Sequence, residues 1–389
     1  MRDAVIVDAV RTPLGKGKPT GAYAGIHPVS LHAHVLRALI ARVPDLDPAT
    51  IDDVIGGAVG QVGEQSGNTT RLAALAAGLP ESVPGVTVDR QCGSSQQALS
   101  FAAQGVISGA YDLVIASGSE SMSRVPIGSQ TLGHDVGGPL ITERYDGGLI
   151  PQGVAAELIA RKWGLSRAQL DEFALLSHHN AARAWSAGRF AAQVAPLAGL
   201  DTDETVRPGA NREAMSALAP SFADPRWERR FGVIDWKVTA GNSSPVNDGA
   251  AALLITTGEY AARHGWRPRA RIHTAVAVGD DPIHMLTGII PATAAVLRRA
   301  GLTLADIDAF EVNEAFSSVV LAWLAETGAD PAKVNVDGGA LAIGHPLGAS
   351  GARLATTLLG VLERTGGRYG LQTMCEAGGT ANATIIERL

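Results

Sequence analysis

The sequence predicts an α/β fold in which helices cover a buried sheet, and three observations support this. Short β-branched segments alternate with Ala- and Leu-rich segments of helical period, the pattern of βα units. Two such units, near opposite ends of the chain, follow a similar order. The 389 residues, 46% of them apolar, suffice for two or three domains with sizeable cores.

The first of these units occupies residues 86–116. Segment 86–89 (VTVD) predicts a strand, and 94–108, entered through Gly93, predicts a helix. Segment 111–116 (YDLVIA) predicts the next strand. The chain therefore passes from strand to helix at residues 89–95.

The second unit occupies residues 334–372. A predicted strand at 334–337 precedes a Gly-rich loop, a helix at 352–362 and a strand near 369–372. Segment 46–55 (LDPATIDDVI) also resembles 302–312 (LTLADIDAFEV). These similarities predict an internal duplication with pseudo-twofold symmetry.

Residues 119–247 interrupt this pattern. They open with a Gly/Pro-rich stretch and continue with helices, one of them begun by a Ser166/Gln169 capping box and ended near Gly188. An insertion of this length predicts a lid or binding subdomain. We expect an N-terminal half at 1–118 plus about 248–268, the insertion at 119–247, and a C-terminal half at 269–389.

Composition excludes several classes of protein. Two cysteines cannot form a disulfide framework, and no Cys/His spacing fits zinc, so we expect no metal. A net charge of −6 without a basic stripe argues against nucleic acid as a partner. Asp8 interrupts the N-terminal apolar run too early for a signal peptide, and no apolar run approaches a membrane span. We expect a cytoplasmic protein that does not bind membranes.

Cys92 is a candidate nucleophile because it lies between a predicted strand and the first turn of a helix. The free N–H groups and dipole of such a turn stabilise a thiolate, although a buried apolar cysteine fits the position equally well. A nucleophile needs a base, and His345 lies in the corresponding Gly-rich loop of the second half. The duplication would bring these two turns together at the sheet ends.

Two further residues are weaker candidates. Cys375 follows the last predicted strand and could carry a proton, but a buried strand cysteine is the simpler interpretation. Asn313 could fix a water molecule or merely cap a helix. Segment 15–18 (GKGK) resembles a phosphate loop only superficially, and no serine-hydrolase, P-loop or dinucleotide motif is present.

Six ordered motifs give the chain a resemblance to the thiolase family over essentially its whole length. They are 89–95 (DRQCGSS), 119–123 (SESMS), 240–249 (AGNSSPVNDG), 313–316 (NEAF), 338–351 (GGALAIGHPLGASG) and 375–379 (CEAGG). Ketoacyl synthases and hydroxymethylglutaryl-CoA synthases share the fold but lack this combination. A non-catalytic lipid carrier would have lost the catalytic residues.

The resemblance implies a five-layer αβαβα thiolase fold with two similar halves and a coenzyme A (CoA)-binding loop domain. It also implies that Cys92 carries the acyl group, His345 activates Cys92, and Cys375 handles the proton of acetyl-CoA. Asn313 would hold a water that stabilises the enolate. The backbone N–H groups of Cys92 and Ala377 would form an oxyanion hole.

For CoA the resemblance implies contacts with the insertion and with the acyl region. The implied positions are Arg207, Ala240, Gly241, Ser244, Met285 and Phe316. The chain departs from the family at segment 151–153 (PQG), where biosynthetic members have His-Met-Gly, and Ala377 replaces a glycine. Ile289 stands where the family has the proline of a GPIPA block.

The implied reaction is thiolytic cleavage of a 3-oxoacyl-CoA by CoA, in fatty acid or steroid breakdown. The alternative is a biosynthetic acetoacetyl-CoA thiolase, which condenses two acetyl-CoA molecules. CoA serves as substrate and no cofactor is expected. A homodimer or homotetramer is the expected assembly.

Overall fold

The computed structural model describes residues 2–389 and contains one mixed sheet of ten strands. The N-terminal half contributes β1 (Val5–Arg11), β2 (Gly15–Lys16), β3 (Asp53–Gly57), β4 (Gly85–Val88), β5 (Leu113–Ser121) and β6 (Asn247–Thr256). The C-terminal half contributes β7 (Ala270–Gly279), β8 (Ala309–Val312), β9 (Tyr369–Glu376) and β10 (Thr380–Arg388).

Strand order confirms the predicted duplication. The sheet runs β4-β3-β5-β6-β1 and continues β7-β10-β9-β8, so the second half repeats the first in mirror order. Equivalent pairs also share their direction: β3·β5 and β8·β9 are parallel, whereas β5·β6 and β9·β10 are antiparallel. The halves join where β1 meets β7 over two residue pairs, Val5↔Arg271 and Ile6↔Ala270.

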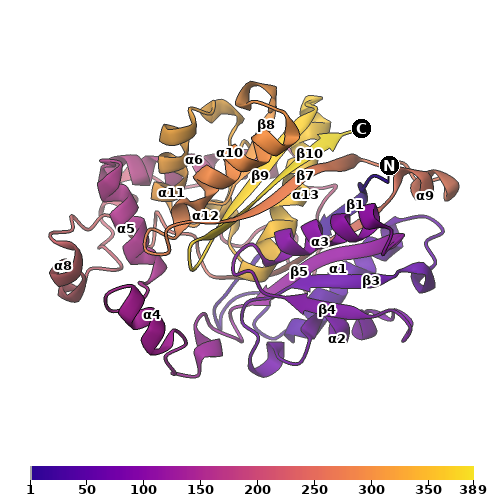
Figure 1. The fold of residues 1–389 in the computed structure, drawn as a ribbon, viewed down its shortest axis with the longest axis horizontal. Helices are drawn as coiled ribbons and strands as arrows, with labels where there is room; N and C mark the ends of the chain where they lie inside the picture. Colours follow the sequence, from indigo (N-terminus) through magenta and orange to yellow (C-terminus); the bar gives the residue numbers. More distant parts are fainter. Residues whose placement is uncertain (1) are drawn as a thin grey trace.

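Three pairs of helices complete the five expected layers (Figure 1). Helices α1 (Pro28–Arg42) and α2 (Thr69–Ala77) pack on the outer face of the N-terminal half. Helices α10 (Ile289–Ala300) and α11 (Ser317–Thr327) cover the outer face of the C-terminal half. Between the halves lie α3 (Ser94–Ser108) and α13 (Ser350–Thr365), whose apolar side chains contact strands of both.

The long insertion connects β5 to β6 and lies to one side of the two halves (Figure 1). Its helices are α4 (Gly138–Arg144), α5 (Gln152–Lys162), α6 (Arg167–Ser186), α7 (Arg212–Ser216) and α8 (Pro225–Phe231). The predicted capping box is confirmed, with Ser166 and Gln169 bonded reciprocally at the start of α6. The equivalent connection between β9 and β10 is a short turn, residues 377–379. The exact domain boundaries stay a prediction.

The remaining elements are short. They are α9 (Gly258–Arg263), α12 (Ala340–Ile343), η1 (Pro48–Thr50), η2 (Gly63–Gln65), η3 (Ser129–Thr131), η4 (Leu286–Gly288), η5 (Leu304–Asp306), η6 (Pro331–Lys333) and η7 (Leu347–Ala349). The resemblance between 46–55 and 302–312 is confirmed, because η1 leads into β3 as η5 leads into β8. No helix within residues 2–389 is both long and apolar enough to cross a membrane.

Two strand predictions need correction. The prediction of a strand at 334–337 is wrong. Val334 makes one isolated bridge to Phe310, and Asn335 then adopts a left-handed conformation with φ 47°. The side-chain amide of Asn335 accepts from Val312 N and donates to Val312 O, both at 2.9 Å, and so replaces a neighbouring strand. The strand expected at 111–116 begins at Leu113 instead and continues to Ser121.

Candidate active site

Cys92 lies at the tip of the turn between β4 and α3. The turn is closed by Ser94, whose hydroxyl accepts from Arg90 N at 2.9 Å and donates to Gln91 O at 2.5 Å. The helix start was expected to stabilise a thiolate, and burial acts in the opposite direction. Burial raises the pKa of Cys92 well above its usual value, and the nearby groups of Cys375 and Glu376 add to the effect.

Three buried polar side chains hold the loop that carries His345. Asn247 Oδ1 accepts from His345 N at 3.1 Å, and Glu120 accepts from Gly348 N at 2.8 Å. Glu314 accepts from Leu341 N at 3.1 Å. These side chains belong to three of the sequence motifs and to both halves. The fold thus fixes the His345 loop from several directions.

The hydrogen bonds of His345 define its tautomer. Its Nδ1 lies 2.6 Å from Ser350 Oγ, and that hydroxyl donates its one proton to Pro346 O at 2.8 Å. Nδ1 must therefore carry the hydrogen and donate it to Ser350, which leaves Nε2 with a free lone pair. Burial, with a smaller contribution from Arg353, lowers the pKa of His345 to about 3, so the ring is neutral at pH 7.

Cys375 and Asn313 lie together at the ends of neighbouring strands. Cys375 is fully buried near the end of β9, and burial raises the pKa of its thiol to about 12. The Asn313 amide lies against this thiol and favours its thiolate, yet neither amide atom makes a hydrogen bond of normal geometry within residues 2–389. His345 Nε2 is likewise buried without a partner in that part of the chain.

A cavity of about 530 Å³ opens between the β2 loop and the insertion. It is lined by Lys16, Lys18, Glu204, Thr205, Val206, Arg207, Ala240, Ser243, Ser244, Pro245 and Val246. Three of the predicted CoA positions, Arg207, Ala240 and Ser244, therefore lie in one cavity.

The other three predicted positions lie elsewhere. A Cβ on Gly241 would come within 3 Å of Met215 and Leu218, so this glycine packs against the insertion rather than lining the cavity. Met285 and Phe316 are buried in the apolar cluster that also contains Cys375. The structure thus separates a polar cavity from an apolar region near the thiols.

Sequence reasoning missed several residues around this cavity. Lys16 and Lys18 line it, and the repeated GKGK was the signal that could have identified them. His178, which lies on α6, accepts from Arg207 N at 3.2 Å and fixes that segment. Ser350 belongs to the motif at 338–351, but nothing in the sequence indicates that its hydroxyl contacts His345.

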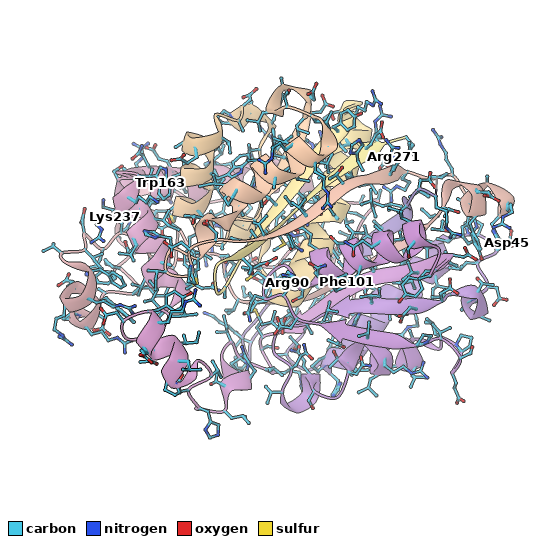
Figure 2. All side chains as sticks on the ribbon, viewed as in Figure 1. Asp45, Arg90, Phe101, Trp163, Lys237 and Arg271 are labelled. Carbon is cyan, nitrogen blue, oxygen red and sulfur yellow. The ribbon has the colours of Figure 1, made fainter. Side chains whose placement is uncertain are left out.

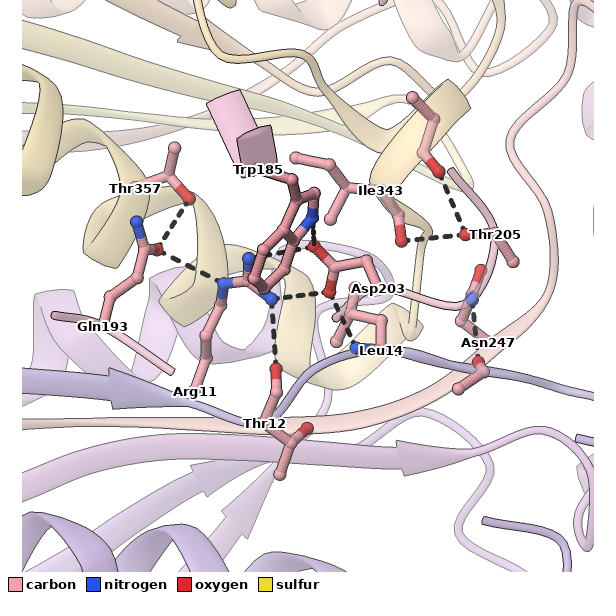
Figure 3. A network of polar contacts seen from close by, with 12 residues as sticks. Arg11, Thr12, Leu14, Trp185, Gln193, Asp203, Thr205, Asn247, Ile343 and Thr357 are labelled. Atoms are coloured by element: carbon pink, nitrogen blue, oxygen red, sulfur yellow. Dashed lines mark hydrogen bonds and ion pairs between the residues drawn. The ribbon is translucent and has the colours of Figure 1, made fainter. Parts of the chain in front are cut away.

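A buried ion pair fastens the insertion beside the cavity (Figure 3). Arg11 donates to both carboxylate oxygens of Asp203, at 2.7 and 3.0 Å, and neither side chain is exposed. Asp203 also accepts from Leu14 N and Trp185 Nε1. Thr205 donates to the carbonyls of Ala342 and Ile343, close to the His345 loop. The network links β1, the insertion and the C-terminal half.

Comparison with known proteins agrees with this arrangement. The model of the thiolase N-terminal domain matches residues 4–259, and that of the thiolase C-terminal domain matches 266–388. A steroid 3-ketoacyl-CoA thiolase of Mycobacterium tuberculosis is 50% identical over all of this chain and 95% of its own length. Enzymes named 3-ketoacyl-CoA thiolase from Erwinia tasmaniensis and Salmonella typhimurium are 43% and 42% identical, each over the full length of both chains. With both domains matched and the two cysteine turns brought together, the chain belongs to the thiolase family.

Proposed function

We propose that the protein cleaves a 3-oxoacyl-CoA with CoA, giving acetyl-CoA and an acyl-CoA shortened by two carbons. The observation that carries this proposal is the set of buried reactive groups near the ends of β8 and β9. Cys375 and the Asn313 amide lie there, and the Cys92 turn packs against the end of β9 through Gly93 and Glu376. The amide of Asn313 and Nε2 of His345 are buried without partners within residues 2–389. The names of the relatives, 3-ketoacyl-CoA thiolase and steroid 3-ketoacyl-CoA thiolase, support the same activity.

In the first half of the proposed reaction, Cys92 gives its proton to His345 Nε2 and attacks the 3-oxo carbon. The bond between carbons 2 and 3 breaks, and its electron pair leaves on acetyl-CoA as an enolate. Asn313 and protonated His345 stabilise this enolate, and Cys375 donates the proton that completes acetyl-CoA. Buried donors aimed at a developing oxyanion contribute about 3 kcal/mol each in comparable sites.

In the second half, incoming CoA gives its thiol proton to the Cys375 thiolate and attacks acyl-Cys92. The backbone N–H groups of Cys92 and Ala377 are our candidates for the oxyanion hole of this step. The departing Cys92 thiolate takes its proton back from His345, which restores both thiols. The raised pKa values of the two cysteines fit this cycle, because each thiol then holds its proton until a substrate arrives.

For CoA binding we propose the cavity between the β2 loop and the insertion. CoA carries phosphates, and three cations, Lys16, Lys18 and Arg207, line the cavity against a single carboxylate, Glu204. Glu204 is already engaged by the backbone N–H groups of Lys16 and Ala22. Ser244 and Ala240 are candidates for the pantetheine arm. The chemistry uses side chains and CoA alone, without a cofactor or metal.

The degradative direction is favoured over acetoacetyl-CoA synthesis. The bulky His-Met pair of biosynthetic members is replaced by Pro151 and Gln152. The Phe222 ring packs directly over Gly153, since a Cβ placed on that glycine would lie 2.4 Å from the ring. Phe222 in turn packs edge-on against Phe316, with ring centroids 6.0 Å apart. We propose that this apolar wall accepts acyl groups of fatty acids or steroids.

The test combines a substrate panel with mass spectrometry. CoA-dependent loss of 3-oxoacyl-CoA is measured for short, medium, long and ring-bearing acyl groups, and the reverse condensation of acetyl-CoA is measured in parallel. We expect thiolysis to dominate and the acyl adduct to lie on Cys92. Cys92→Ala should be inactive, whereas Cys375→Ala should still form the adduct. No thiolysis of any substrate, or an adduct on Cys375 alone, would overturn the proposal.

We further propose that two copies associate through β4, the free edge of the N-terminal half. Large apolar side chains are exposed on β4 and on the helices beside it, namely Leu72, Leu75, Val86, Phe101 and Ile107, of which Phe101 is labelled in Figure 2. Sedimentation should give a dimer or a tetramer built from dimers, and Val86→Lys should release monomers. A reducing compartment such as the cytoplasm suits the two free thiols.

A further inference from the structure

Glu376 is a buried carboxyl group that the proposed reaction does not use. It is the last residue of β9, directly after Cys375, and is fully buried. Neither carboxylate oxygen has a hydrogen-bond partner of normal geometry within residues 2–389. Buried carboxylates are rarely left in this state, because losing water without gaining a partner is costly.

The carboxyl group of Glu376 lies against the turn that carries Cys92. A Cβ placed on Gly93 would lie 1.8 Å from Glu376 Oε1, so no residue other than glycine fits there without displacing the carboxyl group. Gly93 has φ −86°, which any residue can adopt. The glycine next to Cys92 is therefore required by the close approach of Glu376 and not by the backbone conformation.

Few other charges face this carboxyl group. Arg90 and Asp89, from the turn before α3, act on it in opposite directions, and Thr380 lies opposite it in the β9–β10 pairing. Arg90 Nε is itself buried without a hydrogen-bond partner in the described chain, and Figure 2 labels Arg90 near the centre of the molecule. Burial is the main cause that raises the pKa of Glu376 to about 8.

The groups that face Cys92 are the Cys375 thiol and the carboxyl groups of Glu376 and Glu120. Glu120, from β5, is held by hydrogen bonds from Val59 N, Gly60 N, Gln65 and Gly348 N. Glu376 has no comparable set of bonds, since the Thr380 hydroxyl alone favours its ionised form and neither carboxylate oxygen has a partner of normal geometry within residues 2–389. Of the two carboxyl groups, Glu376 is the one free to gain or lose a proton near neutral pH.

We propose that Glu376 is a positioning residue that governs the charge on Cys92: its carboxyl group permits the thiolate while protonated and opposes it once ionised. The inference rests on the proposed role of Cys92 as nucleophile. An ionised carboxylate beside Cys92 places two negative charges in one buried pocket, and a like charge at close range disfavours the charged form. Thiolate formation would then be self-limiting as the pH rises.

The test measures alkylation of Cys92 by iodoacetamide from about pH 6 to 10, a range that spans the ionisation of Glu376 and in which the alkylation rate follows the thiolate fraction of Cys92. Peptide mass spectrometry counts Cys92 separately from Cys375. Glu376→Gln keeps the shape of the side chain and removes its charge. Asp89→Asn is the opposing variant, because Asp89 disfavours the ionised form of Glu376 and is not among the groups that act directly on Cys92.

We expect Cys92 of Glu376→Gln to be alkylated about tenfold faster than wild type at alkaline pH, since a nearby like charge shifts a pKa by about one unit or more. Asp89→Asn should slow alkylation relative to wild type, because Glu376 then ionises at lower pH. Coincident profiles for folded Glu376→Gln and wild type would overturn the inference. Alkylation needs no acyl-CoA, so this outcome is independent of whether thiolysis is detected.

If Glu376→Gln does not fold, a second variant tests the same inference. Arg90 favours the ionised form of Glu376, so Arg90→Gln should keep Glu376 protonated to higher pH and accelerate alkylation of Cys92 above about pH 8. If Arg90 instead stabilised the Cys92 thiolate directly, its loss would slow the alkylation of Cys92. Unchanged or slower alkylation in this variant would count against the inference.

Discussion

Replacing Ser350 with alanine removes the one hydrogen-bond acceptor of His345 Nδ1. In the wild type the ring donates to Ser350 Oγ at 2.6 Å, and this bond keeps the lone pair on Nε2. In Ser350→Ala neither ring nitrogen has a hydrogen-bond partner within residues 2–389, and the protonated ring that forms when Cys92 gives up its proton has its Nδ1–H group buried without an acceptor. The substitution therefore removes the preference for the tautomer that accepts a proton from Cys92 and raises the cost of that proton transfer.

The expected loss of activity follows from the cost of the unpaired donor. A buried N–H group without a partner costs about 1–3 kcal/mol. Each 1.36 kcal/mol corresponds to a factor of ten, so kcat/KM for thiolysis should fall about 5- to 150-fold. The assay is stopped-flow measurement of acyl-Cys92 formation together with steady-state kcat/KM, since the loss should already appear in the first half-reaction.

Thr356→Val is the matched control on the same helix. Thr356 Oγ1 donates to Ala352 O at 2.8 Å, just as Ser350 Oγ donates to Pro346 O at 2.8 Å, and both residues are buried. Each variant thus loses one bond to the carbonyl four residues earlier, but only Ser350→Ala also loses the contact with His345. If the two folded variants have the same kcat/KM, the hydroxyl of Ser350 does not set the tautomer.

Three further predictions concern CoA binding and stability. The double variant Lys16→Ala/Lys18→Ala should raise KM for CoA about 5- to 30-fold, as expected for two phosphate contacts of about 0.5–1 kcal/mol each. Turnover of a pantetheine thioester that has no phosphates should not change. An equal loss with that substrate would exclude phosphate binding by these lysines. Arg11→Ala should lower the free energy of unfolding by about 3–5 kcal/mol, because it leaves Asp203 buried and unpaired. In chemical denaturation Arg212→Ala should lower the free energy of unfolding by less than about 1 kcal/mol, because its pair with Glu172 is exposed. Similar losses of stability in Arg11→Ala and Arg212→Ala would contradict the argument. Burial lowers the pKa of His32 from 6.5 to about 4, so the folded protein holds this ring neutral and loses about 3 kcal/mol of stability as the pH falls from about 6.5 to 4. The variant His32→Gln should make stability depend less on pH over that range. An unchanged slope would show that His32 is not the group responsible.

The parts of the fold that depend on local sequence were predictable. The helix after Cys92 was predicted at 94–108 and is observed as Ser94–Ser108, because its Ala-rich periodicity and flanking glycines are local signals. The duplication was visible because both halves repeat the same short patterns. Cys92 and His345 were candidates because of their places in the two halves, and the resemblance to a family with distinctive motifs then assigned roles to them, to Cys375 and to Asn313.

The features that could not be predicted depend on contacts between residues that lie far apart in the sequence. The strand expected at 334–337 fails because the Asn335 amide binds the backbone of Val312, and a β-branched pattern does not encode such a partner. The thiolate expected at Cys92 is opposed by burial, and this burial depends on residues that are distant in the sequence, such as Cys375 and Glu376. Likewise, nothing in the spacing of Gly93 and Glu376 indicates that the two touch.

The ends of the ten-stranded sheet differ, and this difference limits how the protein can polymerise. At β8 the Asn335 amide occupies the backbone groups of Val312 that another strand would need. At the opposite end β4 is open. When two β4 edges pair across a twofold axis, each copy uses its one open edge, so no edge remains for a third. In the proposed dimer, sheet growth would stop at two copies, and a protein with so long a sheet would be protected from forming fibres.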